Sequence, residues 1–489
     1  MRTAACTAIV LVLVLTGTGF AQTQIPSFEH IVVIVQENRT PDNLFQGLCL
    51  PPYGSASACG TGLRQYDIQS YGFDQKGNRV PLSPVPLGNT YDPGHSHGDF
   101  EVMCNPNKRT YYPCSANTRL ATIGCPSNCS FQYVDPTTNP TIHPYLYLAQ
   151  NFGWANRMFQ TNQGPSSPAH QFLFAGTSAP SAADDANALF VAENPNAGFG
   201  CLTPLNATYA FIDPTHAPNE NKLINNPLGT VCFSHDTMAT LLESTRHTWR
   251  YYTVGVTKTG ISDSIWTAPN WIREICQPNS TFTQCTGADW INNVDLRPSD
   301  VLIDLQSCNL KNMVWVIPTG KNSDHPSGSP HDGGPAWVAN VINGVGTSRC
   351  TDFVNGAAVP YWQDTAIIVV WDDWGGFYDH VMPPFLSAPK QGQGDYQMGF
   401  RVPLIFVSAY TGPIIDSTNQ YDFGSILRFA ERNFGIQEGA LGFADRRSAT
   451  DLSAFYNLKL PPKKFLIPTA VSAEFFLNDT SPPEPPDND

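Results

Sequence analysis

Two adjacent carboxylates, Asp372 and Asp373, directly follow the apolar run Ala366–Trp371, whose residues favour a buried strand. Side chains alternate across a strand, so neighbouring carboxylates reach one point only where the strand ends and the chain bends. Gly375 and Gly376 provide that bend. Carboxylates at the carboxyl edge of a sheet suit a hard divalent cation. Taken alone, the pattern also fits a strand followed by an acidic turn.

A second strand of the same kind strengthens the metal hypothesis. Ile31–Val35 is a continuous apolar run, typical of a strand buried on both faces, and Glu37 and Asn38 follow it. The alternative is an ordinary strand-to-loop junction with a solvated glutamate. Together the two junctions favour an all-oxygen metal shell, because no Cys/His spacing typical of zinc accompanies them.

Ser166 has the setting of a reactive hydroxyl. It follows Gly164–Pro165, a rigid turn that can present a hydroxyl at the start of a helix, where backbone N–H groups can hold phosphate. A serine becomes a strong nucleophile only when a base or a metal activates it. Ser166 could also cap the helix that follows, and that role is compatible with catalysis.

Several histidines are candidates for moving protons, since imidazole titrates in the required range. His95 and His97 alternate, so on an extended segment both could face the same way. His325 follows the predicted strand Met313–Ile317, and His331 lies six residues further on. For each of them, a histidine in a surface loop is the alternative interpretation.

Five segments together resemble a known family. They are Glu37–Thr40 (Glu-Asn-Arg-Thr), Trp371–His380 (Trp-Asp-Asp-Trp-Gly-Gly-Phe-Tyr-Asp-His), Gln163–Phe172 (Gln-Gly-Pro-Ser-Ser-Pro-Ala-His-Gln-Phe), Tyr91–His97 with its Asp-Pro-Gly-His-Ser, and Ser323–Pro326 (Ser-Asp-His-Pro). The family is the bacterial and fungal phospholipase C/acid phosphatase family of phosphoesterases, related to the alkaline phosphatase superfamily. The matches run in the expected order from about Glu29 to Phe455.

The resemblance implies a fold, a metal site and a mechanism. The fold would be α/β, an alkaline phosphatase-like three-layer αβα sandwich with a largely parallel central sheet and loop-rich, disulfide-bonded insertions. Ser166 takes the nucleophile position and forms a phosphoserine, with Ser167 as the alternative. His95 and His325 would act on the phosphoryl and leaving oxygens. The expected ligands of a divalent cation (Ca, Mg, Mn or another) are Glu37, Asn38, Asp372, Asp373 and Ser166, and the expected hydrogen-bonding neighbours are His97, His170, His331 and His380.

One segment departs from the family pattern. Closer members carry a histidine-rich segment before a Pro-Phe pair in the middle of the chain, whereas the comparable region here is Ser264–Trp271, without histidine. Asn270 is a possible stand-in. The missing group leaves the substrate preference open.

Three functions remain under consideration. The leading one is a secreted phosphomonoesterase of the acid phosphatase type. The alternative is a phospholipase C that cleaves the phosphodiester of a lipid headgroup. A non-catalytic exported binding protein is the third, and the complete set of carboxylate, amide and hydroxyl groups speaks against it.

The predicted elements form one domain over residues 22–478. Ile31–Val35, Met313–Ile317, Ala366–Trp371 and Leu404–Val407 are expected strands, and the long intervals between them leave room for helical crossovers. Expected helices are Ser234–Glu243, with Ser234 as its cap, and the amphipathic Tyr421–Arg432. The span from about Leu48 to Pro140 lacks periodicity and is interpreted as an elaborated loop region.

The composition points to an exported protein. Residues 1–21 resemble a signal peptide, and no later segment has about 20 uninterrupted apolar residues. Of the 13 cysteines, Cys6 lies in the signal, and the even number that remains predicts disulfides between near neighbours.

The net charge of −14 argues against nucleic acid as a partner. Residues 479–489 form a Pro-rich acidic tail that we expect to be disordered, and no oligomeric state is indicated.

Overall fold

The computed structural model describes residues 24–74, 76–88, 91–104, 128–194, 200–202, 208–212, 222–225, 232–254, 265–326, 332–386, 396–466, 468 and 471–480. The predicted signal peptide, His331 and most of the predicted tail lie outside these residues, so those expectations stay predictions. Among the helices of the described part, none combines the length and the apolar character needed to cross a bilayer.

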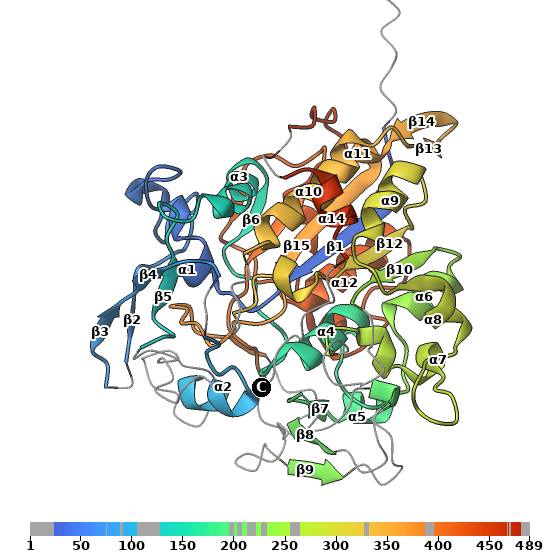
Figure 1. Cartoon of the computed structure of the whole chain (residues 1–489), viewed down its shortest axis with the longest axis horizontal. Coiled ribbons are helices and arrows are strands. Elements are labelled where there is room, and N and C mark those ends of the chain that lie inside the picture. The colour runs from blue at the N-terminus through green and yellow to red at the C-terminus, as the bar shows by residue number, and fades with distance from the viewer. Residues whose placement is uncertain are drawn as a thin grey trace, which may run out of the picture.

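A single large sheet runs through the centre of the molecule (Figure 1). In spatial order its strands are β11 (Val294–Asp295), β10 (Trp249–Tyr252), β12 (Met313–Val316), β1 (His30–Gln36), β15 (Thr365–Trp371), β18 (Leu404–Val407), β6 (Gly153–Ala155) and β19 (Ile414–Asp416). All four predicted strands are therefore confirmed. β1 lies between β12 and β15 and is parallel to both, whereas β18 is antiparallel to β15 and to β6. The sheet is largely parallel, as predicted.

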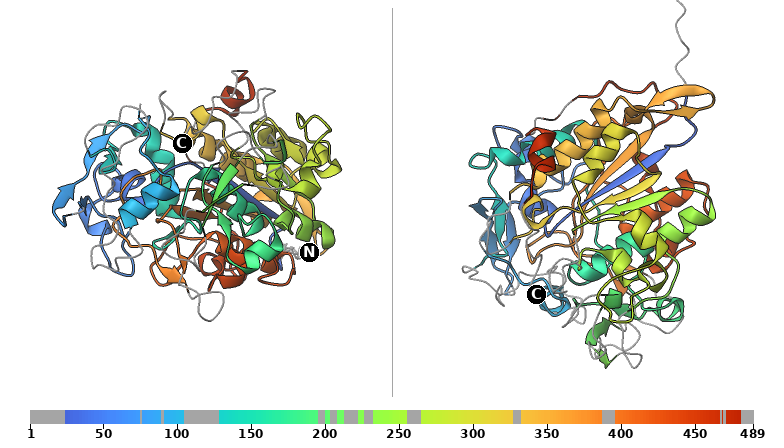
Figure 2. Two further views of the ribbon diagram at one scale, coloured as in Figure 1. Left: turned by 90° about the horizontal axis from the view of Figure 1, so that it is seen from below. Right: turned by 45° about the vertical axis from the view of Figure 1, so that its right-hand side comes forward.

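Helices cover both faces of this sheet, which gives the predicted αβα sandwich (Figure 2). On one face lie α3 (His143–Asn151), α9 (Asp300–Ser307) and α10 (Gly334–Thr347); on the other lie α4 (Ser166–Ala175), α6 (Met238–Ser244) and α12 (Phe423–Asn433). Large aromatic side chains join the layers. Trp371 of β15 packs on Tyr145 of α3 with ring centroids 5.1 Å apart, and Trp315 of β12 packs on Phe174 of α4 at 5.0 Å.

The two predicted helices form, and both begin later than expected, α6 at Met238 and α12 at Phe423. In α12, Asp422 caps the N-terminus by accepting the Ser425 N–H at 3.2 Å. In α6 the cap is Thr237, which forms a reciprocal capping box with Thr240. The prediction that Ser234 caps this helix was wrong, since its hydroxyl instead donates to Glu274 Oε1 at 2.6 Å.

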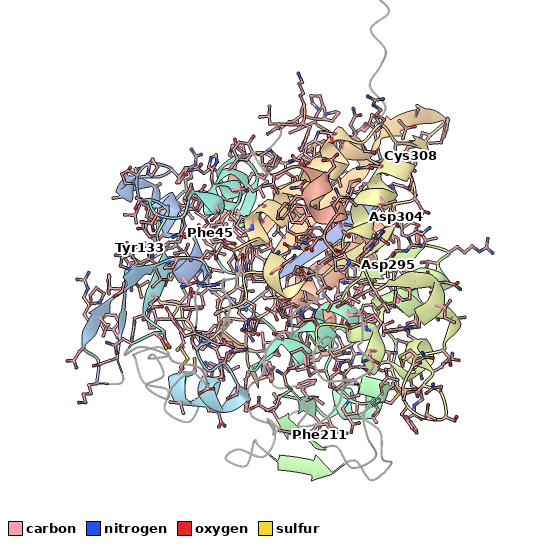
Figure 3. All side chains as sticks on the ribbon, in the orientation of Figure 1. Phe45, Tyr133, Phe211, Asp295, Asp304 and Cys308 are labelled. Carbon is pink, nitrogen blue, oxygen red and sulfur yellow. A yellow bond between two sulfur atoms is a disulfide. The ribbon has the colours of Figure 1, made fainter. Side chains whose placement is uncertain are left out.

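Shorter elements surround the sandwich, and side chains fill the interior (Figure 3). Phe45, for example, packs on Trp154 and Trp371. These elements are α1 (Pro41–Leu44), β2 (Tyr71–Phe73), β3 (Arg79–Pro81), β4 (Ser83–Val85), α2 (His97–Cys104), β5 (Gln132–Val134), α5 (Ala182–Ala186), β7 (Phe190–Val191), β8 (Thr208–Ile212), β9 (Lys222–Asn225), η5 (Ala268–Trp271), α7 (Arg273–Cys276), α8 (Ala288–Asn293), β13 (Thr351–Val354), β14 (Ala357–Pro360), α11 (Tyr361–Asp364), β16 (Phe385–Leu386), β17 (Tyr396–Gln397), α13 (Phe443–Arg447) and α14 (Ala473–Leu477).

Disulfides fasten the peripheral segments, in agreement with the prediction of pairing between near neighbours. The described pairs are Cys49–Cys59, Cys201–Cys232, Cys276–Cys285 and Cys308–Cys350. Cys104 and Cys129 are disulfide-bonded too. Cys114 and Cys125 lie outside the described residues.

Candidate active site

The carboxyl ends of β1 and β15 lie side by side. Gln36 and Trp371 are register partners in the two parallel strands, so the residues that follow them, Glu37 and Asp372, leave the sheet at the same level. The Asn38 N–H donates to Asp372 Oδ1 at 3.1 Å, and this contact ties the two strand ends together. Asn38 has φ +60°, a left-handed conformation that asparagine tolerates better than most residues.

Helix α4, labelled in Figure 1, carries the predicted nucleophile. Ser166 is its first residue, with Pro165 as the N-cap, and its Oγ donates to Asp373 Oδ2 at 3.2 Å. The other oxygen of Asp373 accepts the Gly375 N–H at 2.7 Å, which fixes the carboxylate in the turn after β15. Ser167, the alternative nucleophile, donates its backbone N–H to Asn194 Oδ1 at 3.1 Å.

His170 lies one helical turn after Ser166, on the same side of α4. Its Nε2 is 3.2 Å from Glu37 Oε1 and 3.7 Å from Asp372 Oδ2, and the ligand atoms of these three residues all lie within 4.8 Å of one another. Burial lowers the pKa of His170 to about 4, against the opposing charge of Asp372, so the ring is neutral. His170 thus touches two of the predicted metal ligands.

The two predicted catalytic histidines are also close to each other. The rings of His95 and His325 are edge to face with centroids 6.1 Å apart. His95 Nδ1 donates to the Pro93 carbonyl at 2.9 Å, and its Nε2 lies 3.1 Å from Asn38 Nδ2. Because Asn38 also holds Asp372, the histidines and the carboxylates form one continuous site. Asp92 completes a second group, since its ligand atom and those of His95 and His325 lie within 4.8 Å of one another.

His97 does not face the same way as His95. The alternation argument assumed an extended segment, but α2 begins at His97, and the turn into the helix rotates the two side chains apart. His97 Nδ1 instead donates to the Gln163 carbonyl at 2.8 Å, which supports the loop in front of Ser166. Burial lowers the pKa of His97, so this imidazole acts as a neutral donor.

His380 belongs to a separate ionic cluster. Its Nδ1 lies 2.8 Å from Asp42 Oδ2 and its Nε2 lies 3.0 Å from Asp67 Oδ1, while the neighbouring Asp379 pairs with Arg401 at 2.7 Å. Burial lowers the pKa of His380, but the contacts with Asp42 and Asp67 raise it to about 10. This charged histidine joins the loop after β15 to α1.

Asn270, the suggested stand-in for the missing histidines, has its Oδ1 3.4 Å from Cys285 Sγ and 3.7 Å from Cys276 Sγ, against that disulfide. Its neighbour in sequence, Trp266, is the residue of this segment that lies beside the site, with its ring 5.9 Å from that of His325. Trp374 flanks His95 in the same way at 6.1 Å. Both tryptophans lie in segments that the sequence analysis singled out, but neither was assigned a role, since a core position explains an isolated indole equally well.

Glu193 is a further group that the sequence did not single out. It follows β7 and accepts the backbone N–H groups of His97 and Gly98 at the start of α2. Burial raises its pKa to about 7, although these hydrogen bonds oppose the shift. A glutamate after a short strand carries no recognisable pattern, so only the three-dimensional arrangement reveals it.

The residues fit a divalent cation. Glu37, Asn38, Asp372, Asp373 and Ser166 are completely buried. Burying several carboxylates together is costly unless positive charge or hydrogen bonds compensate them. Asp372 Oδ2 and Asn38 Oδ1 are buried and accept no hydrogen bond from any residue that the structure describes. Buried oxygen atoms without a hydrogen-bond donor are the kind of ligand that a hard cation takes.

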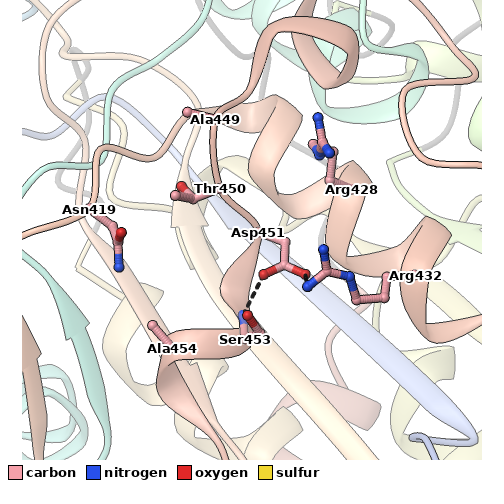
Figure 4. A pocket seen from close by; sticks show the side chains of 8 residues that line it. All are labelled: Asn419, Arg428, Arg432, Ala449, Thr450, Asp451, Ser453 and Ala454. Carbon is pink, nitrogen blue, oxygen red and sulfur yellow. Dashed lines mark hydrogen bonds and ion pairs between the residues drawn. The ribbon is translucent and has the colours of Figure 1, made fainter.

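A pocket on the surface lies away from this site. It has a volume of about 240 Å³ and is lined by residues of α12 and the segment after α13, among them Arg428, Arg432 and Asp451 (Figure 4). Arg432 pairs with Asp451 at 2.7 Å, and both arginines pair with Glu438. None of the predicted site residues lines it.

Comparisons with known proteins find a matching family model, curated relatives and solved structures. A model of the Phosphoesterase family matches residues 28–437. Phospholipase C B of Mycobacterium tuberculosis is 29% identical over 183 residues, covering 34% of this chain and 33% of that protein. Non-specific phospholipase C6 of Arabidopsis thaliana is 27% identical over 159 residues, covering 29% and 28%. The chain thus spans about a third of the curated relatives it matches. A solved structure of an alkaline phosphatase superfamily protein from Vibrio parahaemolyticus aligns over 85% of this chain and 69% of that one, with a TM-score of 0.35 and 10% identity.

Proposed function

This chain belongs to the phosphoesterase family, and from that premise we propose that it is an exported, metal-dependent hydrolase of phosphate esters with Ser166 as its nucleophile. One observation carries the proposal. The Ser166 hydroxyl donates to Asp373, and Glu37 and Asp372 lie together where the strands β1 and β15 end. A hydroxyl next to a cluster of buried carboxylates is the arrangement that phosphoryl transfer to a serine requires.

Glu37, Asn38, Asp372, Asp373 and Ser166 would hold the cation. When bound, it supplies positive charge that favours the serine alkoxide and offsets charge on the phosphoryl oxygens. Ser166 Oγ attacks phosphorus, and an O–P bond forms as the bond to the leaving oxygen breaks. The Ser166 proton passes to Asp373 Oδ2, the acceptor of its hydrogen bond. A water molecule then attacks the phosphoserine and gives a proton to the now neutral His325, while the Ser166–phosphorus bond breaks and Asp373 returns its proton to the serine oxygen.

His325 and His95 serve the leaving group and the phosphoryl oxygens. His325, as an imidazolium, gives a proton to the leaving oxygen, and its position beside His95 places both rings at one side of the carboxylate cluster. The N-terminus of α4 adds a partial positive charge where the phosphoryl group meets Ser166. Asn38 links the histidines to the carboxylates.

Phospholipase C activity on a phosphodiester is the favoured reaction, because curated relatives from bacteria and a plant are phospholipases C by name. Hydrolysis of phosphate monoesters, the reaction first expected from the sequence, is the second candidate. The same nucleophile and carboxylates serve both reactions, so the distinction depends on how the leaving group is bound. The disulfides favour export, since they persist in oxidising compartments.

A substrate panel with two serine variants tests the proposal. Wild type, Ser166→Ala and the neighbouring Ser167→Ala are assayed on p-nitrophenyl phosphate and on p-nitrophenyl phosphorylcholine. We expect Ser166→Ala to lose activity by at least about 10³-fold, as expected when a nucleophile is removed, while Ser167→Ala keeps it. Mass spectrometry after acid quenching should find phosphate on Ser166 with the monoester and phosphorylcholine with the diester. Hydrolysis by Ser166→Ala at the wild-type rate would refute the mechanism, and no hydrolysis of either ester by wild type would favour a binding protein.

A further inference from the structure

The hydrogen bonds around His170 determine which of its two ring nitrogens carries a proton. His170 Nδ1 lies 3.3 Å from the hydroxyl of Tyr251, and that hydroxyl donates to the Trp266 carbonyl at 2.8 Å. A tyrosine hydroxyl has a single proton, and here the carbonyl takes it. The Tyr251 oxygen can therefore only accept from His170, which places the imidazole proton on Nδ1.

The opposite nitrogen of the ring is then the atom directed at the carboxylates. That atom, His170 Nε2, faces Glu37 Oε1 at 3.2 Å and Asp372 Oδ2 at 3.7 Å. Asp372 Oδ2 accepts no hydrogen bond from the described residues, and all three side chains are buried. The ligand atoms of Glu37, His170 and Asp372 all lie within 4.8 Å of one another, a spacing that one cation can bridge.

We propose that His170 Nε2 is a direct ligand of the cation, beside Glu37 and Asp372, and that this nitrogen makes the site prefer a borderline transition ion over Ca²⁺ or Mg²⁺. The inference rests on the proposed metal site and adds a ligand to it. Calcium and magnesium take oxygen ligands almost exclusively, whereas imidazole suits Zn²⁺, Co²⁺ and related ions. Tyr251 and the Trp266 carbonyl act as positioning groups, because they set the tautomer that exposes Nε2.

The first experiment needs only the wild-type protein. The chain is labelled with ¹⁵N-histidine, stripped with a chelator, reloaded with Mn²⁺ and examined by electron spin echo envelope modulation. We expect a nitrogen coupling typical of a bound imidazole. Its absence from the wild-type spectrum would overturn the proposal, because it would show that His170 only donates a hydrogen bond to the carboxylates.

The second experiment compares metal affinities in His170→Asn, Tyr251→Phe and a control, His247→Asn, whose ring packs on Phe434. We expect His170→Asn to bind Zn²⁺ and Co²⁺ more than about 100-fold more weakly, beyond the roughly 10- to 100-fold typical of losing a group that only orients a ligand. Ca²⁺ affinity should change far less. Tyr251→Phe should give an intermediate loss for Zn²⁺, and the control none. An equal loss for Zn²⁺ and Ca²⁺, or a nitrogen coupling that persists in His170→Asn, would contradict direct ligation.

These measurements are independent of catalysis. A protein that shows the nitrogen coupling but hydrolyses no phosphate ester would contradict the proposed function and leave His170 as a ligand. A protein whose hydrolysis depends on Ser166 but whose Mn²⁺ shows no nitrogen coupling would contradict the role of His170 and leave the proposed function intact.

Discussion

The turn after β15 offers a sharp test of whether the two strand ends must meet. Gly375 has φ +59°, and a Cβ added there would lie 2.3 Å from the Asn38 carbonyl oxygen and 2.6 Å from Asn38 Cβ. Asn38 is the residue whose N–H holds Asp372. The substitution Gly375→Ala therefore pushes directly on the junction between β1 and β15.

The size of the effect follows from the clash. Ordinary contacts at a Cβ begin at 3.4 Å, so the Asn38 backbone must retreat by about 1 Å. A misplacement of about 1 Å in a catalytic arrangement can cost about 10²-fold in rate. The left-handed backbone of an alanine adds strain of about 1–2 kcal/mol to the free energy of the folded state. We expect a large loss of activity with a moderate loss of stability.

Gly356→Ala is the matched control. Gly356 also has a left-handed conformation, φ +79°, but its added Cβ would meet no atom within 4 Å. Both variants thus carry the backbone strain, and only Gly375→Ala carries the clash. The readouts are kcat/KM on the p-nitrophenyl esters and the urea unfolding midpoint. Wild-type activity in Gly375→Ala would refute the claim that the strand ends must approach, and an equal loss in Gly356→Ala would assign the effect to backbone strain.

Two further predictions concern the cation and pH. Removing the metal with a chelator should abolish hydrolysis and lower the melting temperature, because an ion that binds only the folded state stabilises it. Adding Mn²⁺ should restore both. A melting temperature unchanged by chelation would contradict the metal site. Burial, followed by the charge of Asp352, raises the pKa of Asp364 from 3.8 to about 9. The protonated carboxyl of Asp364 therefore contributes fully to the free energy of unfolding below pH 3.8, and this contribution is lost as pH rises through 9. Between these values the free energy of unfolding should fall by at most about 1.4 kcal/mol per pH unit. In urea unfolding, Asp364→Asn should remove this fall. A decline of the same slope in the variant would assign it to other groups.

The strands and the carboxylate cluster were predictable because each depends on a local signal. Continuous apolar runs identify β1 and β15, and Glu37 and Asp372 follow their ends. The direction of β18 was not predictable, since an apolar run reads the same in a parallel and an antiparallel strand. The start of α6 was missed because Ser234 and Thr237 are both good caps, and tertiary contacts decide between them.

The groups around the histidines depend on packing between distant segments. Trp266 reaches His325, and Glu193 reaches the start of α2, although neither has a characteristic neighbour in sequence. The contact between Ser166 and Asp373 joins residues 207 positions apart. A resemblance to a family can indicate such a contact, but spacing alone cannot.

The order of strands in the central sheet has a consequence for biosynthesis. β1 precedes the other strands of the sheet in the chain, yet its hydrogen-bonding neighbours, β12 and β15, begin only at Met313 and Thr365. A nascent chain therefore carries the apolar run Ile31–Val35 with both strand edges unpaired until most of the polypeptide has been synthesised. Open edges of this kind invite association with other chains. Closing so long a loop also makes late, slow assembly intrinsic to this topology. Protection of β1 by a chaperone until its neighbouring strands have been synthesised would therefore meet a physical need of the fold.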